Sequence, residues 1–303
     1  MNGAEFRAGF VAVVGRPNVG KSTLVNALVG SKVSIVTAKP QTTRHRILGV
    51  ATAASSQAIF VDTPGLHRAG QKAMNRLMNL TALAAIADAD VVLFVSEACR
   101  WTDDDADVLE RLRKRLRERR KPVIAVLNKI DKVHPRDALL EALAELSSQL
   151  DFAELVPVSA TRGTNIERLR NVLPAYLPES PPLFPAHMLS DRSPAFRAAE
   201  IIREKLMQAL HQELPYGISV QVERYEEAGA GLDIDAVIWV ERESQKGIVV
   251  GKGGRQLKQV GRDARLELRE GTGVPVHLKL WVKVRDNWAD SEADLAALGF
   301  DPV

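Results

Sequence analysis

Cysteine is almost missing from this sequence, since Cys99 is the single one among 303 residues. A lone thiol has no internal partner, which excludes a disulfide framework within the chain and favours a reducing compartment. Long apolar runs are missing too, because none approaches the roughly 20 residues that a membrane-spanning helix needs. The first residues lack the basic and then apolar order of a secretory signal peptide, so we expect a cytoplasmic protein.

The sequence also lacks an excess of either charge. Lysine and arginine number 41 against 38 aspartates and glutamates, which gives a formal net charge of +3. This balance says little about a polyanionic partner, so a local basic patch carries more information. Hydrophobic residues at 46% are ordinary for a globular protein. The length predicts about two domains, each long enough to bury its own core.

Near its start the sequence contains a loop bracketed by glycines, between an apolar run over Phe10–Val14 and a helical segment from Thr23 to Val29. The glycines let several backbone N–H groups point into one concavity beside the positive end of the helix. Lys21 can reach terminal phosphates, and the Ser22 hydroxyl can bind Mg²⁺. The loop therefore predicts a nucleoside triphosphate site. Its residues are Gly15, Arg16, Pro17, Asn18, Val19, Gly20, Lys21, Ser22 and Thr23.

Apolar runs alternate with helix-length segments after this loop. The alternation predicts an α/β fold with a mainly parallel sheet covered on both faces, and ligands in such sheets bind at the carboxyl ends of the strands. The runs are Ala58–Val61, Asp90–Val95, Val123–Leu127 and Leu155–Val158. The helical segments are Lys72–Ala87, Asp103–Arg120, Asp137–Gln149 and Asn165–Leu173.

Two short motifs follow strands directly. The first, Asp62-Thr63-Pro64-Gly65, offers a carboxylate that can hold Mg²⁺ through water and a glycine N–H that can approach a γ-phosphate. The second, Asn128-Lys129-Ile130-Asp131, ends on a carboxylate that can accept two hydrogen bonds from guanine. Adenine presents no such donor pair, and the wrong base would leave a buried charge unpaired. Asp131 therefore argues against an ATP-dependent P-loop kinase, which is one alternative.

The tripeptide Ser159-Ala160-Thr161 follows the next strand and can offer backbone N–H groups to the guanine oxygen. Together the motifs resemble the set found in GTPase domains of the translation-factor class. The resemblance implies a first switch at Gln41–Arg44, where a threonine closes on Mg²⁺. Thr42 and Thr43 both fit, and we favour Thr43. The expected Mg²⁺ ligands are then Ser22, Thr43 and Asp62.

One departure from the common pattern concerns hydrolysis. Many GTPases place a glutamine after the motif glycine to orient the attacking water, and Leu66 stands there instead. We therefore expect slow intrinsic hydrolysis, with Lys21 and Thr43 as catalytic residues. The subfamily with an aliphatic residue at this place implies K⁺ near Asn18. His67 is a weak candidate for a general base, and an exposed switch residue is the simpler interpretation.

Around Leu177 the alternation stops and prolines mark an extended linker. A helix start at Ser193-Pro194 follows, then strands over Ile218–Glu226 and Leu232–Glu243. A Gly-x-x-Gly loop, a helix to about Arg269 and a strand over Val276–Val284 come next. This order matches a type II KH module, whose loop can clamp a single-stranded backbone. The expected RNA contacts are Gly251, Lys252, Gly253, Gly254, Arg255 and Lys258.

We therefore predict a GTPase domain over 1–178, a linker over 179–193, a KH domain over 194–290 and a tail over 291–303. The whole arrangement resembles the Era family of bacterial GTPases. The phrases that are typical of it are Gln41–Arg46, Asp191–Ser193, Ile201–Leu206 and Leu280–Val284.

The resemblance implies a monomeric protein that hydrolyses GTP to GDP and phosphate and binds ribosomal RNA near the 3′ end of the small-subunit rRNA. It also implies a role in assembly of the small ribosomal subunit. Members of the family are found at the inner face of the membrane as well, although this sequence shows no anchor for it. The alternative is a GTP-dependent switch whose KH-like domain binds protein.

Overall fold

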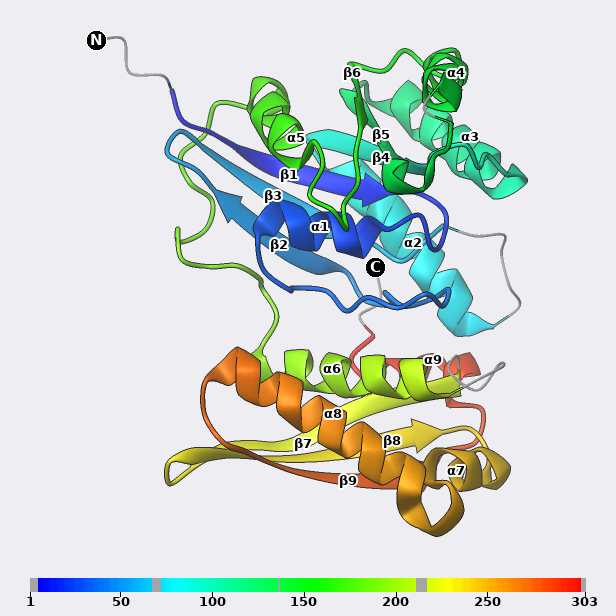
Figure 1. Cartoon of the computed structure of the whole chain (residues 1–303), viewed down its shortest axis with the longest axis vertical. Coiled ribbons are helices and arrows are strands. Elements are labelled where there is room, and N and C mark those ends of the chain that lie inside the picture. The colour runs from blue at the N-terminus through cyan, green and yellow to red at the C-terminus, as the bar shows by residue number, and fades with distance from the viewer. Residues whose placement is uncertain (1–4, 67–71, 136, 211–216, 301–303) are drawn as a thin grey trace.

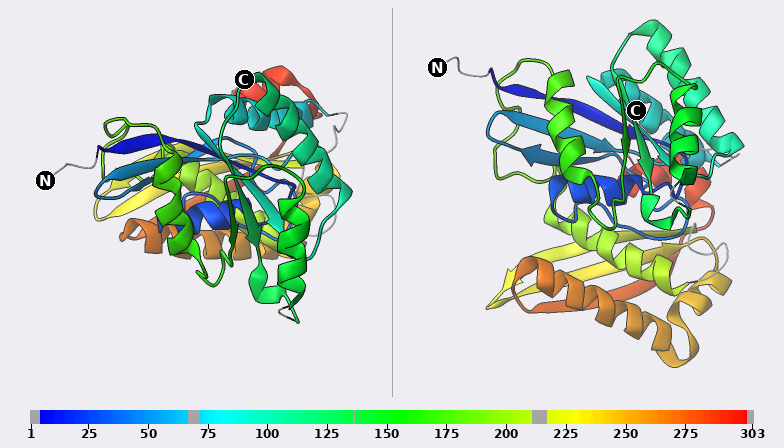
Figure 2. Two further views of the ribbon diagram at one scale, coloured as in Figure 1. Left: turned by 90° about the horizontal axis from the view of Figure 1, so that it is seen from above. Right: turned by 45° about the horizontal axis from the view of Figure 1, so that its top comes forward.

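The structure, a computed structural model, describes residues 5–66, 72–135, 137–210 and 217–300. In Figure 1 and in the right view of Figure 2, two layered units stand one above the other, with helix α6 between them. No helix in these ranges combines the length and the apolar character needed to cross a membrane. The upper unit is an α/β layer and the lower one an α+β layer, so the predicted fold class is confirmed.

The upper unit is built on a sheet with strand order β2-β3-β1-β4-β5-β6. Every neighbouring pair is parallel except β2 and β3, which are antiparallel. All the strands of the upper sheet except β2 match apolar runs of the sequence. The strands are β1 (Arg7–Val14), β2 (Ile47–Thr52), β3 (Ser56–Asp62), β4 (Val91–Glu97), β5 (Val123–Asn128) and β6 (Glu154–Pro157).

Strand β2 was not predicted, and it lies at the edge of the sheet. It follows the charged stretch Arg44-His45-Arg46 directly and has only 6 residues. Its partner β3 follows it in the chain after a short turn, so the pairing is local and antiparallel. The length of β2 is not the reason that it was missed, since β5 also has 6 residues. The run contains Gly49 and Ala51, which are poor strand formers, so its pattern is weak.

Helices cover both faces of the upper sheet. Alternate residues of β1 divide between two apolar clusters, because side chains of a strand point to opposite faces. Val11 and Val13 pack with α1 and α5, whereas Ala12 and Val14 pack with α2, α3 and α4. The helix predicted from Thr23 begins at Lys21. The helices are α1 (Lys21–Val29), α2 (Ala73–Asp88), α3 (Asp103–Glu118), α4 (Asp137–Ser147) and α5 (Ile166–Val172).

The lower unit has a sheet of order β7-β8-β9 with α6 and α8 on one face. Strand β8 pairs antiparallel with β7 and parallel with β9. The second strand of this unit was predicted to extend to Glu243. In the structure the strand ends at Val240, and Glu243 is the first residue of the helix α7. The elements are α6 (Pro194–Ala209), β7 (Ile218–Ala228), β8 (Gly231–Val240), α7 (Glu243–Val250), α8 (Arg255–Thr272) and β9 (Val276–Val284).

The segment between the units lies along the upper sheet. The Gln57 side chain accepts hydrogen bonds from the backbone N–H groups of Leu183 and Phe184 at 2.8 and 2.9 Å. The Val50 N–H donates to the Leu189 carbonyl at 2.9 Å. These bonds fasten the proline-rich segment to β2 and β3. The connection between the two units is therefore held against the upper sheet.

Residues beyond the last strand return to the upper unit. The tail predicted over 291–303 contains a helix, α9 (Glu292–Ala297), which follows a short turn at Trp288–Asp290. Trp288 and Phe300 are buried in one apolar cluster with Met74 and Met78 of α2. The end of the chain therefore contributes apolar residues to the contact between the two units.

Candidate nucleotide and RNA sites

The phosphate loop connects β1 to α1 and leaves no room for a side chain at Gly20. Its φ is +97°, and a Cβ there would lie 2.5 Å from the Asn128 amide nitrogen. That nitrogen donates to the Val19 carbonyl at 2.9 Å. Glycine is needed here for both the left-handed conformation and the close approach. The loop is thereby tied to the strand end that carries the base-reading motif.

The Lys21 side chain lies within the phosphate loop. Its ammonium donates to the carbonyls of Gly15 and Arg16 at 3.1 and 3.0 Å. Only 6% of the residue is exposed. Burial lowers the pKa of Lys21 to about 8, with the Asp62 carboxylate acting in the opposite direction. A phosphate entering the loop would replace these carbonyl contacts with a charge-assisted bond.

Three oxygen-bearing side chains meet at the end of the loop. The hydroxyls of Ser22 and Thr43 lie 2.7 Å apart, and that of Thr43 lies 3.4 Å from the Asp62 carboxylate. Asp62 is fully buried, and burial raises its pKa. Within the described part of the chain its Oδ1 has no hydrogen-bond partner. A buried carboxylate oxygen without a partner beside two hydroxyls fits a hard cation such as Mg²⁺.

The structure also separates the two threonines that the sequence left open. The Thr42 hydroxyl bonds with the Thr37 hydroxyl at 2.6 Å and donates to the Lys39 carbonyl at 2.7 Å. Thr43 is the one that lies against Ser22 and Asp62.

The motif after β3 lies against the phosphate loop. A Cβ on Gly65 would come within 2.8 Å of the Pro17 nitrogen, so the two backbones nearly touch. Thr63 donates to the Val13 carbonyl at 2.9 Å, which holds the motif, including Pro64, at the end of β1. Leu66 is 1% exposed and belongs to the apolar core with α2 and α3. His67 lies outside the described residues.

The residues predicted to read the base meet at the ends of β5 and β6. The Asn128 side-chain oxygen Oδ1 accepts hydrogen bonds from the N–H groups of Lys129 at 2.8 Å and Ala160 at 3.1 Å. The Ser159 hydroxyl donates to the Asp131 carboxylate at 2.5 Å. Asp131 and the neighbouring Thr161 are exposed at the rim. One amide thus connects the two motifs, and the carboxylate lies where a base could approach.

Two acidic residues at this site were missed in the sequence. Asp105 is fully buried and accepts from Arg16 Nε at 2.8 Å. Glu97 accepts from Arg16 at 3.2 Å and from Lys129 at 3.0 Å. Burial alone would raise the pKa of Glu97, but the bonds to Lys129 and Arg16 lower it. The sequence held one signal for these carboxylates, namely Arg16 in the phosphate loop. A buried arginine needs an acidic partner, because an unpaired buried charge is costly.

In the lower unit, the Gly-x-x-Gly loop turns between α7 and α8. Gly251, Gly253 and Gly254 have φ of +71°, +62° and +75°, conformations that L side chains rarely adopt. A Cβ on Gly251 would also lie 2.7 Å from Gln256 Cβ. The three basic side chains predicted as RNA contacts are all exposed at this loop and the first turns of α8. They are Lys252, Arg255 and Lys258.

Comparison with known proteins agrees with this division. Residues 10–129 match the family model described as 50S ribosome-binding GTPase, and residues 213–289 match the KH domain model. A crystal structure of an Era variant from Aquifex aeolicus bound to GDP and AlF₄⁻ is 40% identical. The match covers 97% of this chain and 99% of that one, with a TM-score of 0.93. This chain belongs to the Era family of GTPases.

A second solved structure shows Era in complex with MgGDPNP and nucleotides 1506–1542 of 16S ribosomal RNA. It is 39% identical, covers 97% of this chain and 99% of its own, and has a TM-score of 0.93. The predicted family and the predicted GTPase activity are therefore confirmed. In this Era-family chain the KH domain model covers the Gly-x-x-Gly loop and the basic residues after it.

Proposed function

We propose that this Era-family GTPase binds single-stranded rRNA near the 3′ end of the small-subunit rRNA and acts in assembly of the small ribosomal subunit. The observation that carries the proposal is the 39% identical Era structure with a 16S rRNA fragment, which aligns over 97% of the chain. The glycine loop with exposed Lys252, Arg255 and Lys258 supports the same contact in this chain. A basic loop that clamps a nucleic-acid backbone should lose affinity steeply with salt.

In the proposed mechanism, the loop Gly15–Thr23 and Lys21 hold the phosphates, and Ser22, Thr43 and Asp62 hold Mg²⁺. The bound ion supplies charge neutralisation as the γ-phosphate leaves. Water attacks that phosphate in line, and the protein contributes position and charge stabilisation. Leu66 has no polar group and packs into the core, so intrinsic hydrolysis is slow.

Base selection is assigned to the cluster at the ends of β5 and β6. Asp131 accepts the paired donors of guanine, and Lys129 lies along the base. The Ala160 N–H, which donates to the Asn128 side chain in this structure, turns to the guanine oxygen when the nucleotide binds. The Ser159 hydroxyl, which bonds to the carboxylate in this structure, keeps Asp131 oriented toward the base.

A K⁺ ion near Asn18 is proposed to offset the missing glutamine. Hydrolysis should be faster in KCl than in NaCl at equal ionic strength, and Asn18→Ala should remove the difference. Equal rates in the two salts would rule the ion out.

The RNA contact is tested by crosslinking the full-length protein, bound to a non-hydrolysable GTP analogue, to total RNA and sequencing the products. We expect one discrete site at the 3′ end of the small-subunit rRNA. The double variant Lys252→Asp, Gly253→Asp should lose it while keeping its nucleotide affinity. Arg117→Asp reverses one exposed positive charge on α3, as Lys252→Asp does at the glycine loop, and should keep the crosslink. Diffuse crosslinks, or a double variant that still binds, would favour the protein-binding alternative.

The proposal includes the predicted domain limits of 1–178, 179–193, 194–290 and 291–303. It places a monomer in the cytoplasm, with any contact at the inner membrane face being peripheral. Light scattering tests the monomer, and co-sedimentation with anionic vesicles tests the membrane contact.

A further inference from the structure

The lower unit and the linker hold the stretch that carries Thr43. We call residues 42–48 the switch segment. The Thr42 carbonyl accepts a hydrogen bond from Arg203 of α6, and Arg44 donates to the Ile218 carbonyl at 2.6 Å. Both neighbours of Thr43 are therefore fastened to the lower unit.

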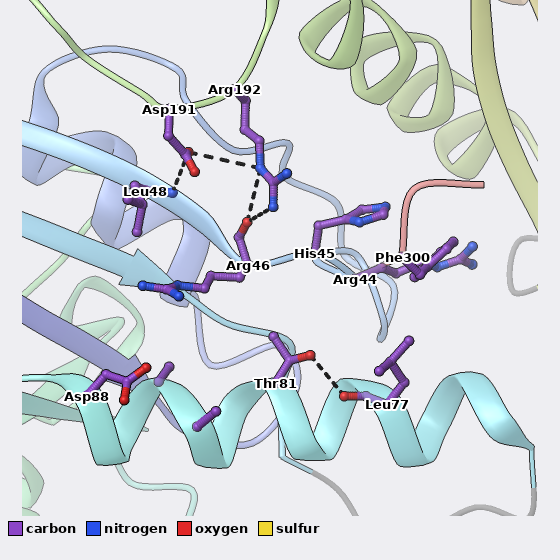
Figure 3. A pocket seen from close by; sticks show the side chains of 12 residues that line it. Arg44, His45, Arg46, Leu48, Leu77, Thr81, Asp88, Asp191, Arg192 and Phe300 are labelled. Carbon is purple, nitrogen blue, oxygen red and sulfur yellow. Dashed lines mark hydrogen bonds and ion pairs between the residues drawn. The ribbon is translucent and has the colours of Figure 1, made fainter. Parts of the chain in front are cut away.

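The remainder of the switch segment is held in the same way. Arg192 donates to the Arg46 carbonyl at 3.1 Å, and Asp191 accepts the Leu48 N–H at 3.0 Å (Figure 3). The His45 ring contacts the Phe196 ring of α6, with centroids 5.2 Å apart. The segment thus runs along the lower unit and the linker until it enters β2.

The Thr43 side chain faces the phosphate site of the upper unit. It is 7% exposed, and its hydroxyl lies 2.7 Å from that of Ser22 and 3.4 Å from the Asp62 carboxylate. Contacts to the lower unit at Thr42 and Arg44 therefore set the position of Thr43 at the phosphates.

Arg203 is itself held in place on α6. It is 3% exposed, and its Nε and Nη2 donate to the two oxygens of Glu200 at 2.7 and 2.6 Å. This bidentate pairing fixes the plane of the guanidinium. Burial would raise the pKa of Glu200, but Arg203 lowers it, so the pair is charged. A fixed, charged donor pointing at a backbone carbonyl is suited to positioning.

A second contact lies one turn along the same helix. Glu204 is 2% exposed, and it accepts the Val36 N–H at 2.8 Å and the Lys32 ammonium at 2.6 Å. Residues four apart share one face of a helix, so Glu200 and Glu204 both face the upper unit. Helix α6 therefore holds the chain before Thr43 as well as the chain beside it.

We propose that Arg203, oriented by Glu200, is a positioning residue that holds Thr43 at the Mg²⁺ and γ-phosphate site. A triphosphate gains from a Thr43 that is held at this site. GDP has no γ-phosphate and gains little from Thr43. The inference rests on the proposed role of Thr43 as a Mg²⁺ ligand, and not on the RNA contact.

The test measures the affinities of the full-length protein for fluorescent GDPNP and GDP in the presence of Mg²⁺. Loss of one charge-assisted hydrogen bond predicts that Arg203→Met weakens GDPNP binding about tenfold. GDP affinity should stay within about twofold, which also shows that the nucleotide site is folded. Arg197→Met is the matched control, because Arg197 is exposed on the same helix and should leave both affinities unchanged.

Removing one member of a buried pair leaves the other charge unpaired and can destabilise the fold. A double variant, Glu200→Leu with Arg203→Met, removes the pair together and should show the same selective loss of GDPNP. In a Thr43→Val background, Arg203→Met should have no further effect on the ratio of the two affinities, because the residue that it positions is gone.

Two results would overturn the inference and can be told apart. If Thr43→Val lowers the GDPNP-to-GDP preference but Arg203→Met and the double variant do not, α6 does not position Thr43. If Thr43→Val also leaves the preference unchanged, the proposed role of Thr43 is wrong. Neither result bears on rRNA binding, which the crosslinking experiment tests separately.

Discussion

Trp288 offers a quantitative test of how the two units are held together. The residue follows the last strand of the lower unit, has no exposed surface and packs with Met74 and Met78 of α2. Its ring lies 6.3 Å from that of Phe300. A buried tryptophan removes about 150–250 Å² from water. At about 25 cal/mol per Å², this burial stabilises the folded chain by about 4–6 kcal/mol.

We expect Trp288→Ala to lower the free energy of unfolding by about 3–5 kcal/mol, the usual cost of truncating a buried tryptophan. Trp288→Phe is the matched control. Within the described residues the indole Nε1 has no hydrogen-bond partner, and phenylalanine removes that buried donor while keeping most of the apolar volume. A buried unpaired donor costs about 1–3 kcal/mol, which offsets part of the lost packing. The Phe variant should therefore lose about 1 kcal/mol or less.

The assay is urea unfolding followed by far-UV circular dichroism, because fluorescence would change with the removed indole. Both variants are compared with the unmodified chain at one protein concentration, and the slope of the transition is fitted in each case. The reasoning fails if the Ala variant lies within about 1 kcal/mol of the unmodified chain. It also fails if the Phe variant is as unstable as the Ala variant, since apolar volume would then not be the cause.

Three further predictions concern the nucleotide site. Asp131→Asn should move the preference from guanine toward xanthine nucleotides in a competition assay, and unaltered selectivity would contradict its role. Burial lowers the pKa of Lys21 to about 8, so above pH 8 the free protein loses a proton that the phosphate-bound form keeps. GTP binding should then weaken and take up a proton, measured by calorimetry in buffers of different ionisation enthalpy. In the free protein the same group should add stability as the pH rises from about 8, because the unfolded chain binds this proton more tightly. Gly65→Ala would place a Cβ 2.9 Å from Pro17 Cα and should weaken GDPNP binding at least tenfold with GDP almost unaffected. Equal losses for both nucleotides would contradict this.

Local chemistry in the sequence determined the family, the fold class and most of the candidate site. The loop Gly15–Ser22 is contiguous, so its glycines, lysine and hydroxyl could be interpreted without knowing what surrounds them. The motifs ending at Gly65 and Asp131 follow directly after buried strands, and parallel strands bring their carboxyl ends to one edge. The loop Gly251–Gly254 was equally local, since its backbone angles need glycine.

Tertiary structure alone decided what depends on a partner distant in the chain. Thr42 and Thr43 have the same chemistry, and only the contact with Ser22 and Asp62 distinguishes them. The partners of Arg16 could not be predicted for the same reason, because Asp105 lies 89 positions further along the chain.

The contact between the two units was likewise beyond the sequence. In the sequence, Arg203 is one charged residue of an amphipathic helix, and Trp288 is an aromatic residue that follows a strand. The packing of whole elements decides which carbonyl Arg203 reaches. It also decides which helix covers Trp288. Periodicity reports which face of an element is apolar, but it does not report what that face meets.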